Sequence, residues 1–318
     1  MAIGSNTSAA IPVSKSVPIA ANLACFFAMV SWASAFPASE ILLESWGAVA
    51  LMTVRLALAV VALMLYWWWR EGSDEVNRAP WAKAIYVGGL GFGIGTALLL
   101  LGQYYSDPVT AALAAAMMPL VGGALEVILD GRKLRSRLLI GLTFALVGGY
   151  LATGSRLGEG TFGLGAVLCV TAVVLFGWAT RAATRYLPGT SSLGQSATTL
   201  VGALFFAPAI WLIAWGIGLD ALSIGKVDAL NIFCIVIYAF VSMAFAQTLW
   251  MFGAGKLGIF IASFHMNAVP FYVMVSVVLI FGEPWSWMQA LGALLVGVGV
   301  IISQTGSLAR IFHKGGPV

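Results

Sequence analysis

The sequence predicts an all-α integral membrane protein, with ten transmembrane helices arranged as two inverted five-helix repeats around a central cavity. The first observation is composition: of 318 residues, 61% are hydrophobic and only 9% are charged, against about 25% charged in soluble domains. The second is that apolar stretches long enough to cross a hydrocarbon core of about 30 Å follow one another along the chain. The third is that the two halves of the sequence resemble each other. Together these observations exclude a water-soluble globular protein.

The predicted helices are continuous apolar segments, without the apolar–polar alternation that the wall of a membrane β-barrel needs. In chain order we expect them at 18–37, 45–69, 81–104, 107–129, 137–154, 161–181, 191–218, 229–252, 257–281 and 286–306. The polar N-terminal segment lacks the features of a cleavable signal peptide. We therefore predict a disordered cytoplasmic tail over 1–17, a first repeat over 18–156, a second repeat over 157–306 and a cytoplasmic tail over 307–318.

The positive charges of the chain predict its orientation. Of the 16 Lys and Arg residues, all but Arg55, Arg156 and Lys226 fall in one alternating set of loops and tails. Because Lys and Arg concentrate on the cytoplasmic side of membrane proteins, we expect a multi-pass protein of the bacterial inner membrane with both termini in the cytoplasm. The same distribution explains the net charge of +4 as a topology signal, so we expect no nucleic-acid partner.

Matching residues recur at equivalent places in the two halves. The aligned pairs are Pro119 with Pro270, Gly131 with Gly282, Gly141 with Gly292, Gly148 with Gly299, and Trp32 with Trp178. Since each half has five helices, an odd number, the second half enters the membrane from the opposite side. Transporters use inverted repeats to exchange inward-open and outward-open states. The repeat therefore favours a carrier of a small-molecule substrate, embedded in the lipid bilayer.

An intramembrane enzyme is the alternative class. A metalloprotease needs paired histidines, but the two histidines, His265 and His313, lie far apart in the sequence. The glycines from Gly91 to Gly95 lie inside an apolar helix and not in a phosphate-binding loop. We therefore expect no catalytic residues, no metal and no other cofactor. For the oligomeric state we expect a monomer, with a dimer as the open alternative.

A Trp-x-Ser element in the first helix (Trp32 to Ser34), Arg55 in the second helix, and a proline in the fourth and ninth resemble the drug/metabolite transporter superfamily. Within it, the chain is most similar to the EamA-type ten-helix exporters, and among these to the YddG-type exporters of aromatic amino acids. The resemblance implies a basket-like bundle around a central cavity and export of amino acids, aromatic or otherwise bulky and apolar, and of related metabolites. Export of organic cations, drugs or other metabolites is the alternative. The second half departs from the pattern, since no arginine matches Arg55 and Ala183 stands where Pro37 would recur.

Arg55 lies about ten residues into the second predicted helix, which places its charge at a depth of about 15 Å. A charge at that depth must face protein or a water-filled cavity, because its exposure to lipid is costly. The guanidinium would then be the charge partner of a substrate carboxylate. The alternative is a structural pair with Glu40 or Glu44 in the adjoining outer loop, or a side chain extended toward that face of the membrane.

Other polar and aromatic residues at membrane depth are candidates for the cavity. Trp32 and Trp178 occupy matching repeat positions and could form two gates or stack on an aromatic substrate, with a lipid-facing position as the alternative. Gln247 shares a helix face with aromatic and methionine side chains, as sparse polar groups in apolar pockets do. His265 lies near the expected midplane, where a substrate or a neighbouring helix could be its hydrogen-bond partner. The predicted cavity residues are Trp32, Ser34, Thr96, Trp178, Thr180, Tyr238, Ser242, Gln247, His265 and Asn267. The predicted gates or hinges, where proline breaks a helical hydrogen bond, are Pro37, Pro119 and Pro270.

Overall fold

The computed structural model describes residues 16–131, 136–153, 160–219, 222–257 and 262–313. Within these ranges all regular structure is helical and no strand occurs, which confirms the predicted class. The first helix begins at Ser16, so most of the predicted tail over 1–17 lies outside the described residues. The last helix runs on to His313, past the predicted helix end at 306.

The described residues of each half form a succession of helical segments. The first half contains α1 (Ser16–Ala33), α2 (Ala35–Leu43), α3 (Ala48–Glu71), α4 (Ser73–Arg78), α5 (Trp81–Val87), η1 (Gly88–Gly93), α6 (Ile94–Tyr105), α7 (Pro108–Ala116), α8 (Met118–Asp130) and α9 (Ser136–Thr153). The second half contains α10 (Phe162–Tyr186), α11 (Ser192–Gly216), α12 (Ala229–Val236), η2 (Ile237–Phe245), α13 (Ala246–Leu257), η3 (Ser263–Ala268), α15 (Val269–Phe281) and α16 (Trp287–His313). Two of these elements, η1 and η2, are π-helical, and η3 is a 3₁₀-helix.

Polar residues between the apolar runs determine where several helices begin. The Asp107 carboxylate accepts a hydrogen bond from the backbone N–H of Thr110 at the start of α7, and Pro108 occupies the first turn, where its missing N–H costs nothing. The Ser191 hydroxyl accepts from Gly194 N–H at the start of α11. At the start of α12 the Asp228 carboxylate accepts from Asn231 N–H. Each cap satisfies a backbone donor that the helix leaves unpaired.

Length and apolar composition qualify most of the segments as membrane spans. Among the described residues, seven continuous spans pass on their own: Ile19–Leu43, Ala48–Glu71, Trp81–Tyr105, Phe162–Tyr186, Ser192–Gly216, Ala229–Leu257 and Ser263–Phe281. The helices Pro108–Ala116 and Met118–Leu129 form an eighth if their 41° bend lies within one span. The other two predicted spans correspond to the shorter apolar helices Leu139–Ala152 and Trp287–Ile302.

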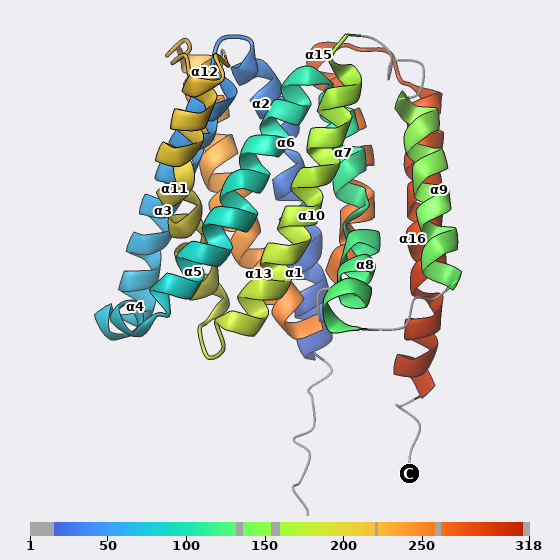
Figure 1. Ribbon diagram of the computed structural model, residues 1–318, viewed down its shortest axis with the longest axis horizontal. Coiled ribbons are helices and arrows are strands. Elements are labelled where there is room, and N and C mark those ends of the chain that lie inside the picture. Colours follow the sequence, from blue (N-terminus) through green and yellow to red (C-terminus); the bar gives the residue numbers. More distant parts are fainter. Residues whose placement is uncertain (1–15, 132–135, 154–159, 220–221, 258–261, 314–318) are drawn as a thin grey trace, which may run out of the picture.

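The two halves run through the bundle in opposite directions. Figure 1 shows α1 rising from the end of the bundle where α16 finishes, whereas α10, its counterpart in the second half, runs back toward that end. We call this end, where α1 begins and α16 ends, the termini end. The opposite end carries the connections 44–47 and 222–228, which are joined by hydrogen bonds from Gly47 N–H to Ser223 O (2.8 Å) and from Trp46 Nε1 to Lys226 O (3.1 Å).

Small residues allow equivalent helices of the two halves to pack closely. The α1 helix packs against α13, and α10 packs against α6 in the matching contact. At α9 and α16, which stand side by side at the edge of the bundle (Figure 1), a Cβ on Gly148 would lie 2.6 Å from Gly292 O, and one on Gly299 would lie 2.6 Å from Gly141 O. These four glycines are two of the pairs that the sequence repeat aligns, so the repeat appears in space as a symmetric helix crossing.

Candidate functional site

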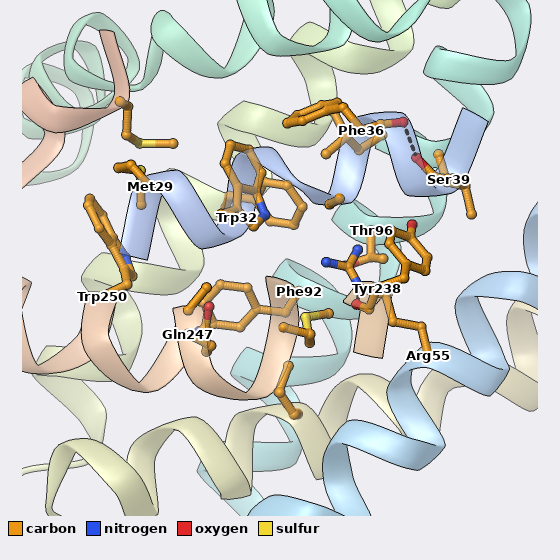
Figure 2. Close-up of a pocket in the computed structure, with 18 of the residues that line it drawn as sticks. Met29, Trp32, Phe36, Ser39, Arg55, Phe92, Thr96, Tyr238, Gln247 and Trp250 are labelled. Atoms are coloured by element: carbon orange, nitrogen blue, oxygen red, sulfur yellow. Dashed lines mark hydrogen bonds between the residues drawn. The ribbon is translucent and has the colours of Figure 1, made fainter. Parts of the chain in front are cut away.

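A cavity lies between helices of both halves and is the candidate functional site (Figure 2). Its empty space, open solvent at its mouth included, is about 830 Å³. The predicted residues that the structure brings together around it are Trp32, Arg55, Thr96, Thr180, Tyr238 and Gln247. They come from α1, α3, α6, α10, η2 and α13, so residues distant in the sequence share one site.

Arg55 is the charged residue of this lining, and its side chain is only 4% exposed. Its Nε donates to Tyr238 O (2.9 Å), and its Nη2 donates to Ser242 Oγ (3.1 Å) and Ser242 O (3.4 Å). The guanidinium carbon also lies 3.9 Å from the centre of the Tyr238 ring, a distance at which the ring face attracts a cation. The two residues that hold the guanidinium therefore both belong to η2.

The π-helical register of η2 explains why this segment can receive an arginine. A π-helix has poorer, wider hydrogen-bond geometry than an α-helix and is frequent at functional sites. Two backbone carbonyls of η2, those of Tyr238 and Ser242, accept hydrogen bonds from Arg55. The structural alternative of a pair with Glu40 or Glu44 is wrong for the described residues, because the partners of Arg55 there are Tyr238 and Ser242.

The bonds of Arg55 leave one of its nitrogens available. The three hydrogen bonds described above use Nε and Nη2 and leave Nη1 unused. Arg55 lines the cavity, so its guanidinium borders the space that a ligand would occupy. Figure 2 shows the guanidinium beside Thr96 and Tyr238.

Aromatic side chains form much of the remaining wall. Trp32 meets Phe36 edge to face, with ring centres 5.2 Å apart. Phe92 of η1 stacks on Phe176 of α10 at 6.1 Å, and all four rings line the cavity. The sulfur-containing and aromatic side chains at the rest of the wall are Met29, Met118, Met243, Trp250 and Met266. Such a wall suits an apolar ligand body with one polar end.

The other polar lining residues are few. Thr180 Oγ1 donates to Phe176 O within its own helix (2.8 Å). Gln247 Nε2 is buried and has no hydrogen-bond partner within the described part of the chain. No three His, Cys, Asp or Glu side chains gather as a metal site would require in the described ranges.

The remaining predicted cavity residues do not line this cavity. Ser34 Oγ donates to Ser31 O (2.6 Å), and Ser242 Oγ accepts a hydrogen bond from Arg55 Nη2. Trp178 stands edge-on to Tyr86, with ring centres 5.8 Å apart. His265 Nδ1 lies 3.1 Å from Ala262 O, which makes its contact local. Asn267, also in η3, has a buried Oδ1 with no partner among the described residues.

Two of the three predicted prolines stand beside breaks in their helices. Pro119 is the second residue of α8, directly after the bend between α7 and α8. Pro270 stands in the first turn of α15, where the 3₁₀ segment η3 passes into the α-helix. Pro37 lies within α2, three residues beyond the junction between α1 and α2.

A polar network at the end of the cavity away from the termini was not expected from the sequence. Ser39 of α2 and Gln103 of α6 both line the cavity, and Gln103 binds the carboxylate of Glu40. Glu40 was expected in an outer loop, but α2 continues to Leu43 and carries Glu40 on the helix. The signal that could have found the network is the polar Gln103 within a predicted span, which needs a partner at that depth.

Comparison with known proteins identifies the family. The model of the EamA-like transporter family matches residues 19–154 and 163–305, one match in each half. A protein of known crystal structure has the same fold, with a TM-score of 0.66 and 18% sequence identity over 92% of this chain and 98% of that one. No curated protein matches the sequence. With an all-helical structure of two inverted halves around one cavity, this chain belongs to the EamA-like transporter family of the drug/metabolite transporter superfamily and is a multi-pass membrane transporter.

Proposed function

We propose that the protein exports amino acids with aromatic or other bulky apolar side chains across the bacterial inner membrane by alternating access. The observation that carries the proposal is the guanidinium of Arg55, whose bonds to η2 use Nε and Nη2, in a cavity walled largely by aromatic and methionine side chains. A carboxylate bound to Arg55 would supply the missing counter-charge, and the side chain of the amino acid would lie against the apolar wall. Hydrogen bonds between ionised partners are about twice as strong as neutral ones.

The charge of the lining argues against organic cations as substrates. Arg55 is the one charged side chain among the described residues of the cavity wall. A permanent cation would meet a like charge there in a medium of low dielectric constant, where repulsion is much stronger than in water. An amino acid presents an anionic group to the same nitrogen, so it fits the cavity better than a cationic drug does.

The inverted halves explain how the cavity could open alternately to the two sides of the membrane. If each half adopts the conformation of the other, the cavity opens to the opposite side of the membrane while the site itself changes little. The breaks between α1 and α2, between α7 and α8, and between η3 and α15 are the places at which helices can bend. These breaks lie on helices that contribute Trp32, Met118 and Met266 to the wall, so bending there would reshape the cavity.

The test is transport by the purified protein in liposomes. Flux of labelled phenylalanine, tryptophan and methionine is measured with and without unlabelled substrate on the other side. We expect saturable flux that is accelerated by substrate on the trans side. The absence of flux above that of empty liposomes for every amino acid would overturn the substrate assignment, and flux without saturation would indicate a channel.

A matched pair of variants locates the site. Trp32→Ala removes a ring that lines the cavity, whereas Trp178→Ala removes the ring at the matching repeat position, which packs against Tyr86 outside it. We expect the concentration of phenylalanine at half-maximal flux to rise roughly threefold to tenfold for Trp32→Ala, by the energy of one aromatic contact. For Trp178→Ala it should stay unchanged. Equal effects of the two substitutions would place the substrate elsewhere.

A further inference from the structure

The network of Ser39, Glu40 and Gln103 closes the end of the cavity away from the termini. The Ser39 hydroxyl lies within hydrogen-bonding distance of two acceptors, Gln103 Oε1 (2.9 Å) and Phe36 O (3.1 Å), while Gln103 Nε2 donates to Glu40 Oε2 (2.9 Å) and to Phe36 O (3.0 Å). Gln103 is 4% exposed and Ser39 is 1% exposed, and both residues line the cavity. The group behind them, Glu40, does not itself line the cavity.

The partners of Gln103 determine which way its amide points. An ionised carboxylate and a backbone carbonyl can only accept hydrogen bonds. Both lie at Nε2, so the amide nitrogen must face Glu40 and Phe36, and the oxygen must face Ser39. Gln103 Oε1 then has one lone pair left, and Ser39 Oγ has its own lone pairs. This end of the cavity therefore offers acceptors to a ligand, not donors.

The electrostatic environment has the same sign as these acceptors. Glu40 lies close enough to Glu44, Asp107 and Glu283 to interact with them electrostatically. All four residues belong to the same end of the bundle, at or beyond the ends of α2, α6 and α15. Arg55, in contrast, presents a donor and a positive charge. In Figure 2, Arg55 and Ser39 lie toward one side of the cavity, and Met29 and Trp250 lie toward the other.

We propose that Glu40, acting through Gln103, makes this end of the cavity a subsite for the ammonium group of a zwitterionic substrate. The inference rests on the proposed function and deepens it. The substrate carboxylate binds Arg55 Nη1, its ammonium group donates to Gln103 Oε1 and Ser39 Oγ, and its apolar side chain extends along the aromatic wall. The site then recognises both charges of an α-amino acid and discriminates against a carboxylic acid that lacks the ammonium group. Glu40 is a positioning residue: it orients the amide and supplies the negative charge behind it.

The test compares phenylalanine with two ligands that each lack one of its charged groups: 3-phenylpropionate lacks the ammonium group and phenethylamine lacks the carboxylate. Dissociation constants of phenylalanine, 3-phenylpropionate and phenethylamine are measured by titration calorimetry on the full-length protein in nanodiscs. We expect the wild-type protein to bind phenylalanine roughly tenfold or more tightly than 3-phenylpropionate, the effect of one charged hydrogen bond. In Glu40→Gln the amide of residue 40 can still accept from Gln103, so the network keeps its shape and loses only its charge.

The decisive measurement is the ratio of the dissociation constants of phenylalanine and 3-phenylpropionate. We expect Glu40→Gln to weaken the binding of phenylalanine roughly tenfold and to leave the binding of 3-phenylpropionate unchanged, so that the preference for phenylalanine disappears. Glu75→Gln is the matched control, because Glu75 is an exposed carboxylate on α4, outside the acidic group around Glu40; the preference should persist in it. Equal weakening of both ligands by Glu40→Gln, or equal loss of preference in Glu75→Gln, would overturn the subsite while the proposed function stands. Wild-type protein that binds none of the three ligands would instead contradict the proposed function.

Discussion

The guanidinium of Arg55 divides its donors between the protein and the cavity. Nε and Nη2 bind carbonyl and hydroxyl oxygens of η2, which fixes the orientation of the side chain without neutralising its charge. The Tyr238 ring adds a face that attracts the cation. A buried charge that has hydrogen bonds but no anion in contact is costly, and a bound carboxylate would lower that cost. The arrangement is therefore suited to a ligand that brings an anionic group.

Substitution of Arg55 by lysine tests this division of donors. Lysine keeps the charge but has a single nitrogen, which cannot bind the η2 oxygens and face the cavity at the same time. We expect Arg55→Lys to weaken phenylalanine binding roughly tenfold and to lower the melting temperature, measured by calorimetric titration and by thermal unfolding in detergent. Arg70→Lys, at an exposed site near the end of the same helix, should change neither. Unchanged affinity in Arg55→Lys would mean that the guanidinium is structural only.

Polar residues within apolar segments could be found from the sequence, but their partners could not. Arg55, Thr96 and Gln247 were predicted because each stands out in a continuous apolar run, and all three line the cavity. For Arg55 the sequence offered a substrate carboxylate or a pair with Glu40 or Glu44, whereas its partners in the structure lie on a helix distant in the sequence. Glu40 was assigned to a loop because the first predicted helix ends at 37. The structure breaks the helix at Ser34 and starts α2 before the proline, whose missing N–H is tolerated in a first turn.

At the scale of elements, the third helix of each half contains a π-helical segment at the level of the cavity. In the first half η1 carries Phe92, and in the second half η2 carries Tyr238 and Met243. Both helices were predicted from the sequence, because each is a long continuous apolar segment. The π register was not predictable, because it depends on which backbone groups pair and not on hydropathy. The segments widen their helices where the wall must accommodate large rings and an arginine.

The crossing of α9 and α16 depends on the absence of side chains at its contacts. A Cβ at Gly292 would lie 2.5 Å from Gly148 O and 2.6 Å from the Cβ of Ala152, whereas one at Gly297, on the same helix, would meet nothing within 4 Å. We expect Gly292→Ala to destabilise the protein by roughly 1–3 kcal/mol through overpacking. Gly297→Ala should be neutral or slightly stabilising, because alanine has the higher helix propensity. Thermal unfolding in detergent measures both, and equal melting temperatures would show that α9 can move away from α16 at no cost.

At the scale of the whole molecule, the two halves share a fold but differ in how their second and third helices meet. Between α3 and η2 the gap holds the side chain of Arg55. Between α11 and η1 the helices touch, and a Cβ on Gly88 would collide with the backbone of Thr199. The sequence predicted this difference in part, since it has no second arginine matching Arg55. The consequence in space, one wide polar contact and one tight apolar contact, makes the cavity asymmetric, so its polar groups gather on one side.

Orientation in the membrane determines which side of the membrane the Glu40 end of the cavity faces. The charge pattern predicts that the termini end lies in the cytoplasm. Ser73, in α4, lies at that end and Lys226 at the other, and both are exposed. Native cysteines interfere little, because Cys25 and Cys169 are 0% exposed and Cys234 is 3% exposed. We expect a membrane-impermeant maleimide to label Lys226→Cys in intact cells, and to label Ser73→Cys only after the cells are permeabilised. The reverse pattern would place Glu40 and its acidic neighbours on the cytoplasmic side and would contradict the predicted orientation of the carrier.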